Sequence, residues 1–289
     1  MKKIAGTVFG MMMILAAGSS AFANGTKDSG SVTAVTVTAS GSSALLPLVK
    51  DAAAKYKSVN PAVSVNVSGG GSGTGLAQVS DGSVDIGNSD VFAESKLSAD
   101  KAAALVDHKV CIITMAPVIN NELAKTVKNL TKQQLIGIFT AQTKNWKEVG
   151  GPDEPILLVT RPTTSGTRAL FKQYALDNNE EASNKSLETD DSGTLLQTVS
   201  GNKGAIGYLA LSYLVNNSAV STVSIDGVAP TMQNTYNGSY PVWGYEHMYT
   251  KGTGNKAALD FIAYITGSDY GKLMEAQGYC VTSKMKVTR

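Results

Sequence analysis

Residues 32–56, VTAVTVTASGSSALLPLVKDAAAKY, show a pattern that the rest of the chain repeats. The part from Val32 to Thr38 is almost all β-branched, which is typical of a strand. The part from Ala44 to Tyr56 has apolar residues at helical spacing. Gly41, Ser42 and Ser43 separate the two parts. The stretch therefore predicts a strand, a tight loop and a helix in that order.

The same order of elements recurs along the chain. Apolar or alternating runs predict strands at 63–67, 84–87, 110–118, 156–160, 204–209 and 241–249. Helical patterns lie at 76–79, 98–106, 131–139, 256–266 and 270–276, and further helices are expected to begin near 165 and 192. Strands that alternate with helices predict an α/β protein whose sheets are largely parallel and flanked by helices.

Two of these runs, 110–118 and 241–249, are long enough to connect two lobes. They lie where the chain could cross from one lobe to the other and later return. We therefore predict a two-lobed α/β fold in which two hinge strands join the lobes. Lobe one is expected to contain 30–115 and 242–289, and lobe two 116–241.

The first 23 residues have the features of a signal peptide. Lys2 and Lys3 precede an apolar run at 4–17, and Ala21-Phe22-Ala23 is a small-x-small cleavage pattern. The apolar run is shorter than the ~20 residues that span a membrane. Gly18 stands where a lipid anchor would need a cysteine. We expect cleavage after residue 23 and an exported protein, periplasmic or extracellular, while the type of cell envelope stays open.

Composition argues against several classes of function. The chain has 25 Lys and Arg residues and 23 Asp and Glu residues, and loss of Lys2 and Lys3 would leave 23 of each. A neutral surface provides no general field for binding nucleic acid. His108 and His247 are the two histidines, and neither lies in a cluster with metal-ligand spacing. We expect no metal, no cofactor, no nucleic-acid partner and a monomer.

Cys111 and Cys280 are the two cysteines, and an oxidising compartment would permit a disulfide. Both lie in strand-like runs, so pairing requires these strands to be neighbours. A disulfide and two buried thiols remain equally open.

Three loops combine glycines with small hydroxyl residues directly before a helix: 41–44, 71–75 and 163–167. The first N–H groups of a helix have no partner within the helix and the helix dipole is positive there, so such loops can bind an anion. Hydroxyl side chains supply further donors. Ser192-Gly193-Thr194 has a similar composition, but there we expect an ordinary helix cap.

Arg161 and Asp90 narrow the class of anion. An arginine beside a helix start can make a bidentate contact with a tetrahedral oxyanion. Asp90 ends the run DIGNSD at 85–90, close to the second glycine loop in the predicted fold. An ionised carboxylate can only accept a hydrogen bond, so it suits a ligand that carries a proton, as phosphate does and sulfate does not.

Together these motifs resemble the PstS-like phosphate-binding proteins of high-affinity phosphate ABC transporters, which have the type II periplasmic-binding-protein fold. The likeness covers nearly all of the chain after residue 23, through 41–47, 71–75, 87–90 and Arg161 with 165–167. It implies that inorganic phosphate is captured between two closing lobes and delivered to the permease subunits of an ABC transporter. The site residues it implies are Ser43, Ala44, Ser72, Asp90, Arg161, Ser165, Gly166 and Thr167.

The resemblance also implies a role for each residue. Ser43 and Ala44 would donate backbone N–H groups, and Ser43 and Ser72 would add their hydroxyls. Asp90 would accept the phosphate proton, while Arg161 would pair with phosphate oxygens and with Asp90. The donors Ser165, Gly166 and Thr167 would lie at a helix N-terminus.

Other functions remain as alternatives. Sulfate, molybdate or a phosphorylated metabolite could occupy the same donors, and a phosphate sensor would need the same site as a transporter subunit. A serine hydrolase would use Ser72 or Ser165 with His247 as the base, but no Gly-x-Ser-x-Gly elbow flanks either serine. A phosphatase that used Asp90 would also want a metal.

Overall fold

The structure is a computed structural model that describes residues 34–289. The signal peptide predicted at 1–23 lies outside the described residues. Within 34–289, no helix is both long enough and apolar enough to cross a membrane.

The main sheet contains nine strands. Their order is β2-β1-β3-β11-β4-β8-β6-β7, and β9 also pairs with β4. The strands are β1 (Val35–Gly41), β2 (Val63–Ser68), β3 (Ile86–Ser89), β4 (Leu105–Asn120), β6 (Leu157–Thr160), β7 (Leu187–Glu188), β8 (Ala205–Ala210), β9 (Val220–Thr222) and β11 (Trp243–Lys251). A separate parallel pair joins β5 (Asn129–Leu130) to β10 (Ser224–Ile225).

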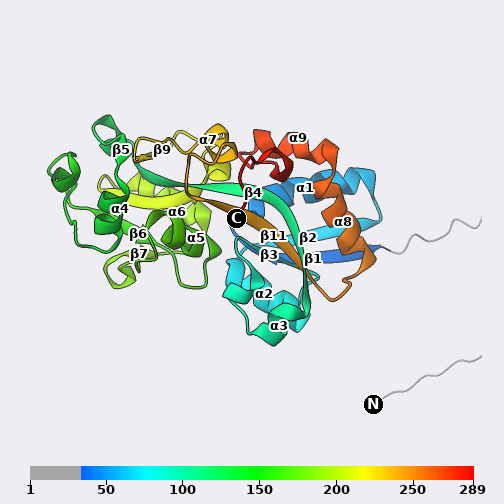
Figure 1. The fold of residues 1–289 in the computed structure, drawn as a ribbon. Helices are drawn as coiled ribbons and strands as arrows, with labels where there is room; N and C mark the ends of the chain where they lie inside the picture. Colours follow the sequence, from blue (N-terminus) through cyan, green and yellow to red (C-terminus); the bar gives the residue numbers. More distant parts are fainter. Residues whose placement is uncertain (1–33) are drawn as a thin grey trace, which may run out of the picture. The chain divides into compact units, whose positions relative to one another are not determined.

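Helices cover both ends of this sheet (Figure 1). They are α1 (Leu46–Val59), α2 (Ser72–Asp81), α3 (Ala99–Ala103), α4 (Lys132–Phe139), α5 (Gly166–Ala175), α6 (Ser192–Gly201), α7 (Met232–Tyr236), α8 (Lys256–Thr266) and α9 (Ser268–Ala276). In α1, Leu48, Val49, Ala52 and Tyr56 are buried at intervals of one to four residues, which places one face against the sheet.

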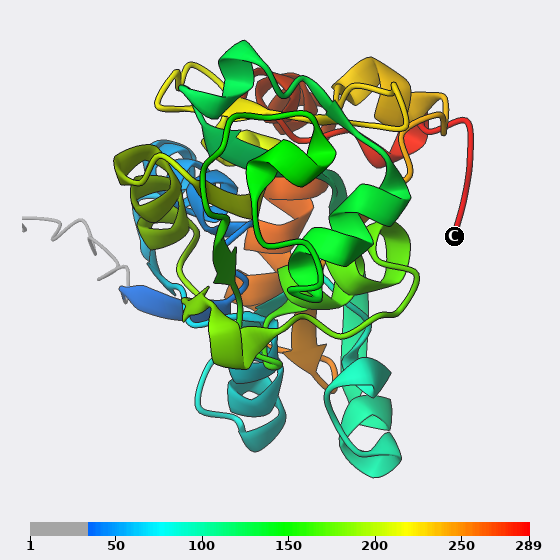
Figure 2. The same cartoon turned by 90° about the vertical axis from the view of Figure 1, so that its left-hand side faces the viewer.

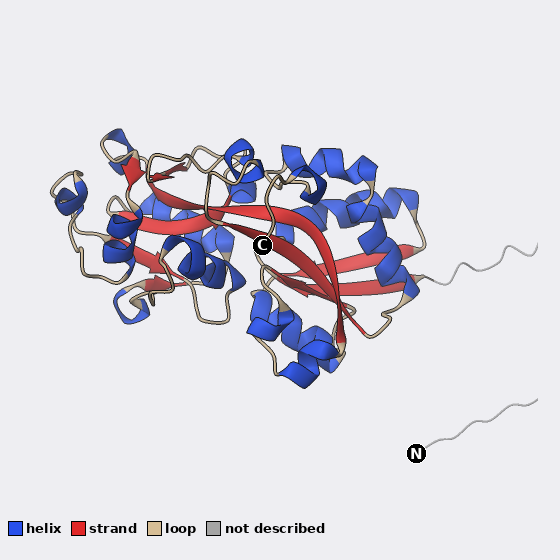
Figure 3. Cartoon of the chain, viewed as in Figure 1, coloured by secondary structure: helices blue, strands red, loops and turns tan. Residues whose placement is uncertain are grey.

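Two long antiparallel strands connect two parallel groups. At one end β1 pairs in parallel with β2 and β3, and at the other end β6 pairs in parallel with β7 and β8. Between them β4 and β11 run antiparallel, from Thr114 opposite Trp243 to Leu105 opposite Lys251. Figure 3 shows β4 and β11 extending through both groups, and Figure 2 views the group with β6 and β8 in front of the other. The predicted two-lobed α/β fold with two hinge strands is confirmed, while the lobe boundaries remain a prediction.

Among the element boundaries that differ from the sequence prediction, those of two helices matter for the site. The helix expected at 98–106 ends at Ala103, because Leu105 and Val106 already pair with β11 as the start of β4. The second glycine loop also ends earlier than expected. Helix α2 begins at Ser72 rather than near Leu76, so Ser72 occupies the first turn of a helix.

Cys111 and Cys280 are both buried free thiols in the described part of the chain. Cys280 does lie beside β4, where it exchanges two backbone hydrogen bonds with Ile112. Adjacent residues of a strand point to opposite faces, so Cys111 and Ile112 face different sides. Cys280 packs with Ile112 and Trp243, whereas Cys111 belongs to the main core. The two segments are neighbours through an isolated bridge, but the two thiols lie on opposite faces of the sheet.

Candidate functional site

The first glycine–serine loop lies between β1 and α1 and contacts the loop before α6. Ser43 is 4% exposed and donates its hydroxyl to the Asp190 carbonyl over 2.9 Å. The Ser43 and Ser192 hydroxyl oxygens lie 3.0 Å apart. Ala44 is fully buried, and its carbonyl accepts a hydrogen bond of 2.6 Å from the Tyr279 hydroxyl. This loop therefore touches an element from the other group of strands.

Ser72 and Asp90 are joined directly to Thr167. The Ser72 hydroxyl accepts a hydrogen bond of 3.0 Å from the Asp90 backbone N–H. Oδ2 of Asp90 accepts a hydrogen bond of 2.6 Å from the Thr167 hydroxyl. All three side chains are buried. The fold thus brings together residues 72, 90 and 167, as the sequence predicts.

The N-terminus of α5 packs against Ser72 and Asp90 through Gly166. A Cβ added at Gly166 would lie 2.8 Å from Cβ of Ser72 and 2.9 Å from Cβ of Asp90. Ser165 precedes Gly166 as the helix N-cap, and its hydroxyl accepts from the Arg168 N–H over 3.3 Å. Glycine is required at 166 because any side chain would separate α5 from Ser72.

Arg161 is fully buried at the end of β6. Its guanidinium donates to the Asp190 carbonyl over 3.2 Å and to the Ser192 hydroxyl over 2.9 Å. The Tyr208 ring lies beneath it, with 5.7 Å between the guanidinium carbon and the ring centroid. The expectation that Arg161 pairs with Asp90 is wrong within the described residues. The guanidinium instead donates to Asp190 and Ser192 at the start of α6, which lie next to it.

Two residues at the start of α6, Asp190 and Ser192, were not assigned to the site from sequence. A Cβ added at Gly71 would lie 2.8 Å from Cγ of Asp190, so the second glycine loop packs closely against this carboxyl group. Burial raises the pKa of Asp190, and Arg161 opposes the shift. Asp191 caps α6, but Ser192 bonds to Arg161 and Ser43 and is therefore more than the ordinary cap we expected. The sequence Ser-Gly-Thr at 192–194 was the signal that could have identified Ser192 as a site residue.

Lys96 is a third residue that the sequence analysis missed. Its ammonium group donates to the carbonyls of Thr163 and Ser165 over 2.6 and 3.3 Å. Burial lowers the pKa of Lys96, whereas Asp190 and Asp90 act in the opposite direction. Lys96 therefore contributes positive charge to the site and links its two sides.

Several buried polar atoms at this site have no hydrogen-bond partner within residues 34–289. They are Oδ1 of Asp90, Nε of Arg161 and Oδ1 of Asp190. Buried polar groups are nearly always bonded, to the protein or to another molecule. The site combines a guanidinium, an ammonium, hydroxyls and a helix N-terminus with two carboxyl groups, those of Asp90 and Asp190. Such a set suits a small oxyanion that also carries a proton.

The PBP superfamily domain profile matches residues 14–269 of this sequence. The chain belongs to the PBP superfamily. It is 49% identical over 254 residues to "Phosphate-binding protein PstS" of Bacillus subtilis, which covers 88% of this chain and 83% of that protein. This similarity confirms the family that the sequence motifs indicate.

Solved structures of PBP-type proteins are similar as well. A putative phosphate ABC transporter substrate-binding protein from Clostridium perfringens, solved with bound phosphate, matches with a TM-score of 0.77 and 29% identity. The match covers 85% of this chain and 98% of that one. An ABC-type phosphate transport receptor from Vibrio cholerae matches with a TM-score of 0.66 and 27% identity, over 84% and 99% of the two chains.

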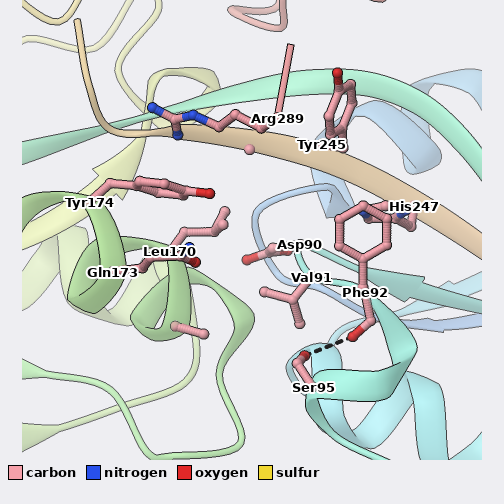
Figure 4. Close-up of a pocket in the computed structure, with 12 residues that line it drawn as sticks. Asp90, Val91, Phe92, Ser95, Leu170, Gln173, Tyr174, Tyr245, His247 and Arg289 are labelled. Carbon is pink, nitrogen blue, oxygen red and sulfur yellow. Dashed lines mark hydrogen bonds between the residues drawn. The ribbon is translucent and has the colours of Figure 1, made fainter. Parts of the chain in front are cut away.

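A cavity of about 150 Å³ adjoins the site of this PBP superfamily member on the side of the hinge (Figure 4). Asp90 lines it, but none of the other seven predicted site residues does. Its walls include Phe92, Leu170 and Tyr174, so it is mainly apolar. Arg289 closes one side, with its guanidinium 3.6 Å from the Tyr174 ring centroid. The anion donors lie elsewhere, and this cavity supplies an apolar boundary to Asp90.

The residues of a serine hydrolase are not assembled in this PBP fold. Nδ1 of His247 lies 2.7 Å from Oδ1 of Asp107, and the ring stacks on Tyr249. The hydroxyls of Ser72 and Ser165 accept from backbone N–H groups instead. Within residues 34–289, no group of three or more His, Cys, Asp or Glu side chains could hold a metal ion.

Proposed function

We propose that this chain is an exported solute-binding protein that captures inorganic phosphate between its two lobes and delivers it to an ABC-type permease. The observation that carries the proposal is the buried Asp90 acceptor, which lies among the hydroxyl, guanidinium and helix-terminal donors of Thr167, Arg161 and α5. The names of the B. subtilis, C. perfringens and V. cholerae relatives support the same ligand.

In the proposed complex, the eight residues predicted from the sequence bind phosphate. They are Ser43, Ala44, Ser72, Asp90, Arg161, Ser165, Gly166 and Thr167, with Asp190, Ser192 and Lys96 supporting them. Residues 30–115 with 242–289 form one lobe and 116–241 the other. The contacts between Ser43 and Asp190 and between Asp90 and Thr167 cross from one proposed lobe to the other. Closure of the lobes then buries the anion away from water.

Asp90 explains how phosphate is distinguished from sulfate. Oδ1 of Asp90 needs a donor, and protonated phosphate supplies one. Sulfate would place a second acceptor against the buried carboxylate. Mismatches of this kind give discrimination of about 10⁴-fold or more. We infer binding without catalysis, since Ser72 and Ser165 are bonded to backbone groups and His247 to Asp107.

The test is calorimetric titration of refolded, phosphate-free protein with phosphate and with sulfate. We expect one phosphate per chain and no sulfate heat. In Asp90→Asn the amide can donate, so phosphate affinity should fall by at least about 10-fold and sulfate should bind. Asp100→Asn, an exposed carboxylate in α3, is the matched control and should behave as the wild type.

Each alternative ligand has its own result. Absence of phosphate binding by the stripped protein would overturn the proposal, and molybdate, sulfate or a phosphorylated metabolite would be titrated next. Phosphate binding with unchanged sulfate rejection in Asp90→Asn would leave the ligand intact but remove Asp90 from its role. Stimulation of a reconstituted permease by the loaded protein distinguishes a transport subunit from a phosphate sensor.

A further inference from the structure

Glu246 is a buried carboxyl group that the proposed phosphate site does not use. It lies in the hinge strand β11 and is 0% exposed. Strand β11 pairs antiparallel with β3, with His247 opposite Ser89. Glu246 and Asp90 are the next residues along the two strands beyond this pair, and their carboxyl groups are close enough to interact. Two carboxyl groups therefore meet where the hinge borders the anion site.

The oxygens of both groups lack partners. Neither Oε1 nor Oε2 of Glu246, nor Oδ1 of Asp90, has a hydrogen-bond partner in the part of the chain that the structure describes. Oδ2 of Asp90 is occupied by the Thr167 hydroxyl. The remaining groups that face Glu246 are Cys111, opposite it on β4, and Tyr279. Burial raises the pKa of this thiol and this phenol, so both are neutral at pH 7.

An ionised Glu246 would be a second uncompensated carboxylate beside Asp90 in a site that receives an anion. Both carboxyl oxygens of Glu246 lack a partner among residues 34–289, so no cation pairs with this group there. An unpaired buried charge is strongly unfavourable, and a like charge nearby adds to the cost. Burial and the adjacent Asp90 accordingly raise the pKa of Glu246 well above its usual range.

We propose that Glu246 is a neutral carboxylic acid whose O–H faces Asp90 and holds the Asp90 carboxylate in place as the acceptor of the ligand proton. The two carboxyl groups do not meet full hydrogen-bond geometry in this structure, so donation requires rotation about a terminal side-chain torsion, which is soft. A carboxylate has about four lone-pair sites, so Asp90 can accept from Thr167, Glu246 and phosphate together. The inference rests on the proposed function.

This positioning role determines specificity. Without a donor at 246, the Asp90 carboxylate loses one of the hydrogen bonds that orient it toward the ligand proton. Phosphate then loses affinity relative to sulfate, and the distinction between the two anions weakens. Glu246 is therefore expected to protect the selectivity of the site rather than to bind phosphate itself.

The first test compares Glu246→Gln with Glu246→Met by calorimetry with phosphate and sulfate between pH 6 and 8.5. The Gln amide still donates, so the ratio of sulfate to phosphate Kd should stay within about threefold of wild type. Met keeps the volume but has no donor, and the ratio should fall by about 10- to 100-fold. An unchanged ratio in Glu246→Met, or an equal loss in Glu246→Gln, overturns the proposal.

The second test needs neither ligand nor the Met variant. Infrared spectroscopy of the phosphate-free protein at pH 8.5 should show the C=O stretch of a protonated carboxyl group, and Glu246→Gln should remove it. Glu181→Gln is the matched control, because Glu181 has a pKa of about 7 and is ionised at pH 8.5. Absence of the band in the wild type overturns the proposal. Failure of phosphate binding with the band present would instead reject the proposed function.

Discussion

At the scale of single residues, polar side chains of this site are buried and bonded to one another across the two sides. Thr167 donates to Asp90, and Ser43 donates to the Asp190 carbonyl. A hydrogen bond to a charged group stabilises by about 1.5–3 kcal/mol, and loss of one partner leaves the other unsatisfied. The hydroxyls are therefore expected to fix the position of the Asp90 carboxylate as well as to contact a ligand.

Replacement of Thr167 by Val tests this role. Val preserves the shape of the side chain but removes the donor to Oδ2 of Asp90. We expect the phosphate Kd to rise by about 10- to 100-fold, in line with one lost charge-assisted hydrogen bond. Calorimetric titration measures the change. Thr198→Val, which removes an exposed hydroxyl bonded to its own helix, should change the Kd less than twofold.

Glu181 makes stability depend on pH. Burial raises its pKa to about 7, although the Tyr208 hydroxyl and Arg168 oppose the shift. The folded state thus binds this proton more tightly than the unfolded state. The associated stability is present below the unfolded pKa and is lost as pH rises through the folded value. Its full loss corresponds to at most about 3 kcal/mol.

The measurement is denaturant unfolding at pH 5 and pH 7.5. The free energy of unfolding of the wild type should fall over this interval. Glu246 also has a raised pKa, so Glu181→Gln should remove only the share of the decrease that Glu181 contributes. Glu188→Gln, which replaces a partly exposed carboxyl near the same Arg168, should show the full wild-type decrease. Equal pH dependence in the wild type and Glu181→Gln would show that Glu181 is ionised throughout this range.

At the scale of elements, the site depends on how closely α5 approaches α2 and the end of β3. Gly166 permits this approach, because its ideal Cβ would lie 2.8 Å from Cβ of Ser72. Gly166→Ala should fold, since alanine is a better helix former than glycine by about 1 kcal/mol. The added methyl should keep α5 from seating, and the phosphate Kd should rise by at least about 10-fold.

Gly193→Ala is the matched control for this variant. Gly193 occupies the equivalent first turn of α6, and a Cβ there would meet one atom, Oδ1 of Asp191, at 3.3 Å. Its affinity for phosphate should be within about threefold of wild type. Thermal unfolding without ligand checks that both variants are folded. A tightly binding Gly166→Ala would contradict the packing argument.

The elements themselves could be predicted from sequence because their signals are local. The β-branched run at 32–38 and the helical spacing at 44–56 depend on neighbours within a few positions, and they correspond to β1 and α1. The start of β4 at Leu105 was missed, since it is set by pairing with β11, nearly 150 positions away. Strand pairing overrides a local helical pattern there.

Site residues with a local sequence signal could likewise be predicted, whereas those placed by long-range contacts could not. Loops 41–44, 71–75 and 163–167 were found because glycines and hydroxyls before a helix form a local pattern. Asp190 and Glu246 have no such pattern. Their importance comes from the strand pairing that places Glu246 near Asp90 and from the packing of Gly71 against Asp190. The partner of Arg161 was misassigned for this reason, since sequence does not give the position of the loop before α6.

At the scale of the whole molecule, direct contacts join the two proposed lobes. Lys96 donates to the carbonyls of Thr163 and Ser165, and the Gly73 N–H donates to the Thr164 carbonyl over 3.0 Å. These bonds exist only when the loops meet, so they favour the closed arrangement. Lys96 also lies close enough to Asp90 and Asp190 for their charges to act on it.

Replacement of Lys96 by Met should therefore weaken closure and remove positive charge from the site. We expect phosphate to dissociate about 10-fold faster, as for one lost hydrogen bond to a charged group. Stopped-flow displacement measures this rate. Lys101→Met is the matched control, because it removes an exposed ammonium that pairs with Asp81 on the surface, and its rate should match wild type.

The dependence of the two rates on salt separates the two effects of Lys96. Loss of the Lys96 charge should slow phosphate association at low ionic strength, and this effect should disappear as the salt concentration rises. Loss of the contact between the lobes should accelerate dissociation at every salt concentration. Unchanged dissociation in Lys96→Met would show that the hinge strands alone set the closed state.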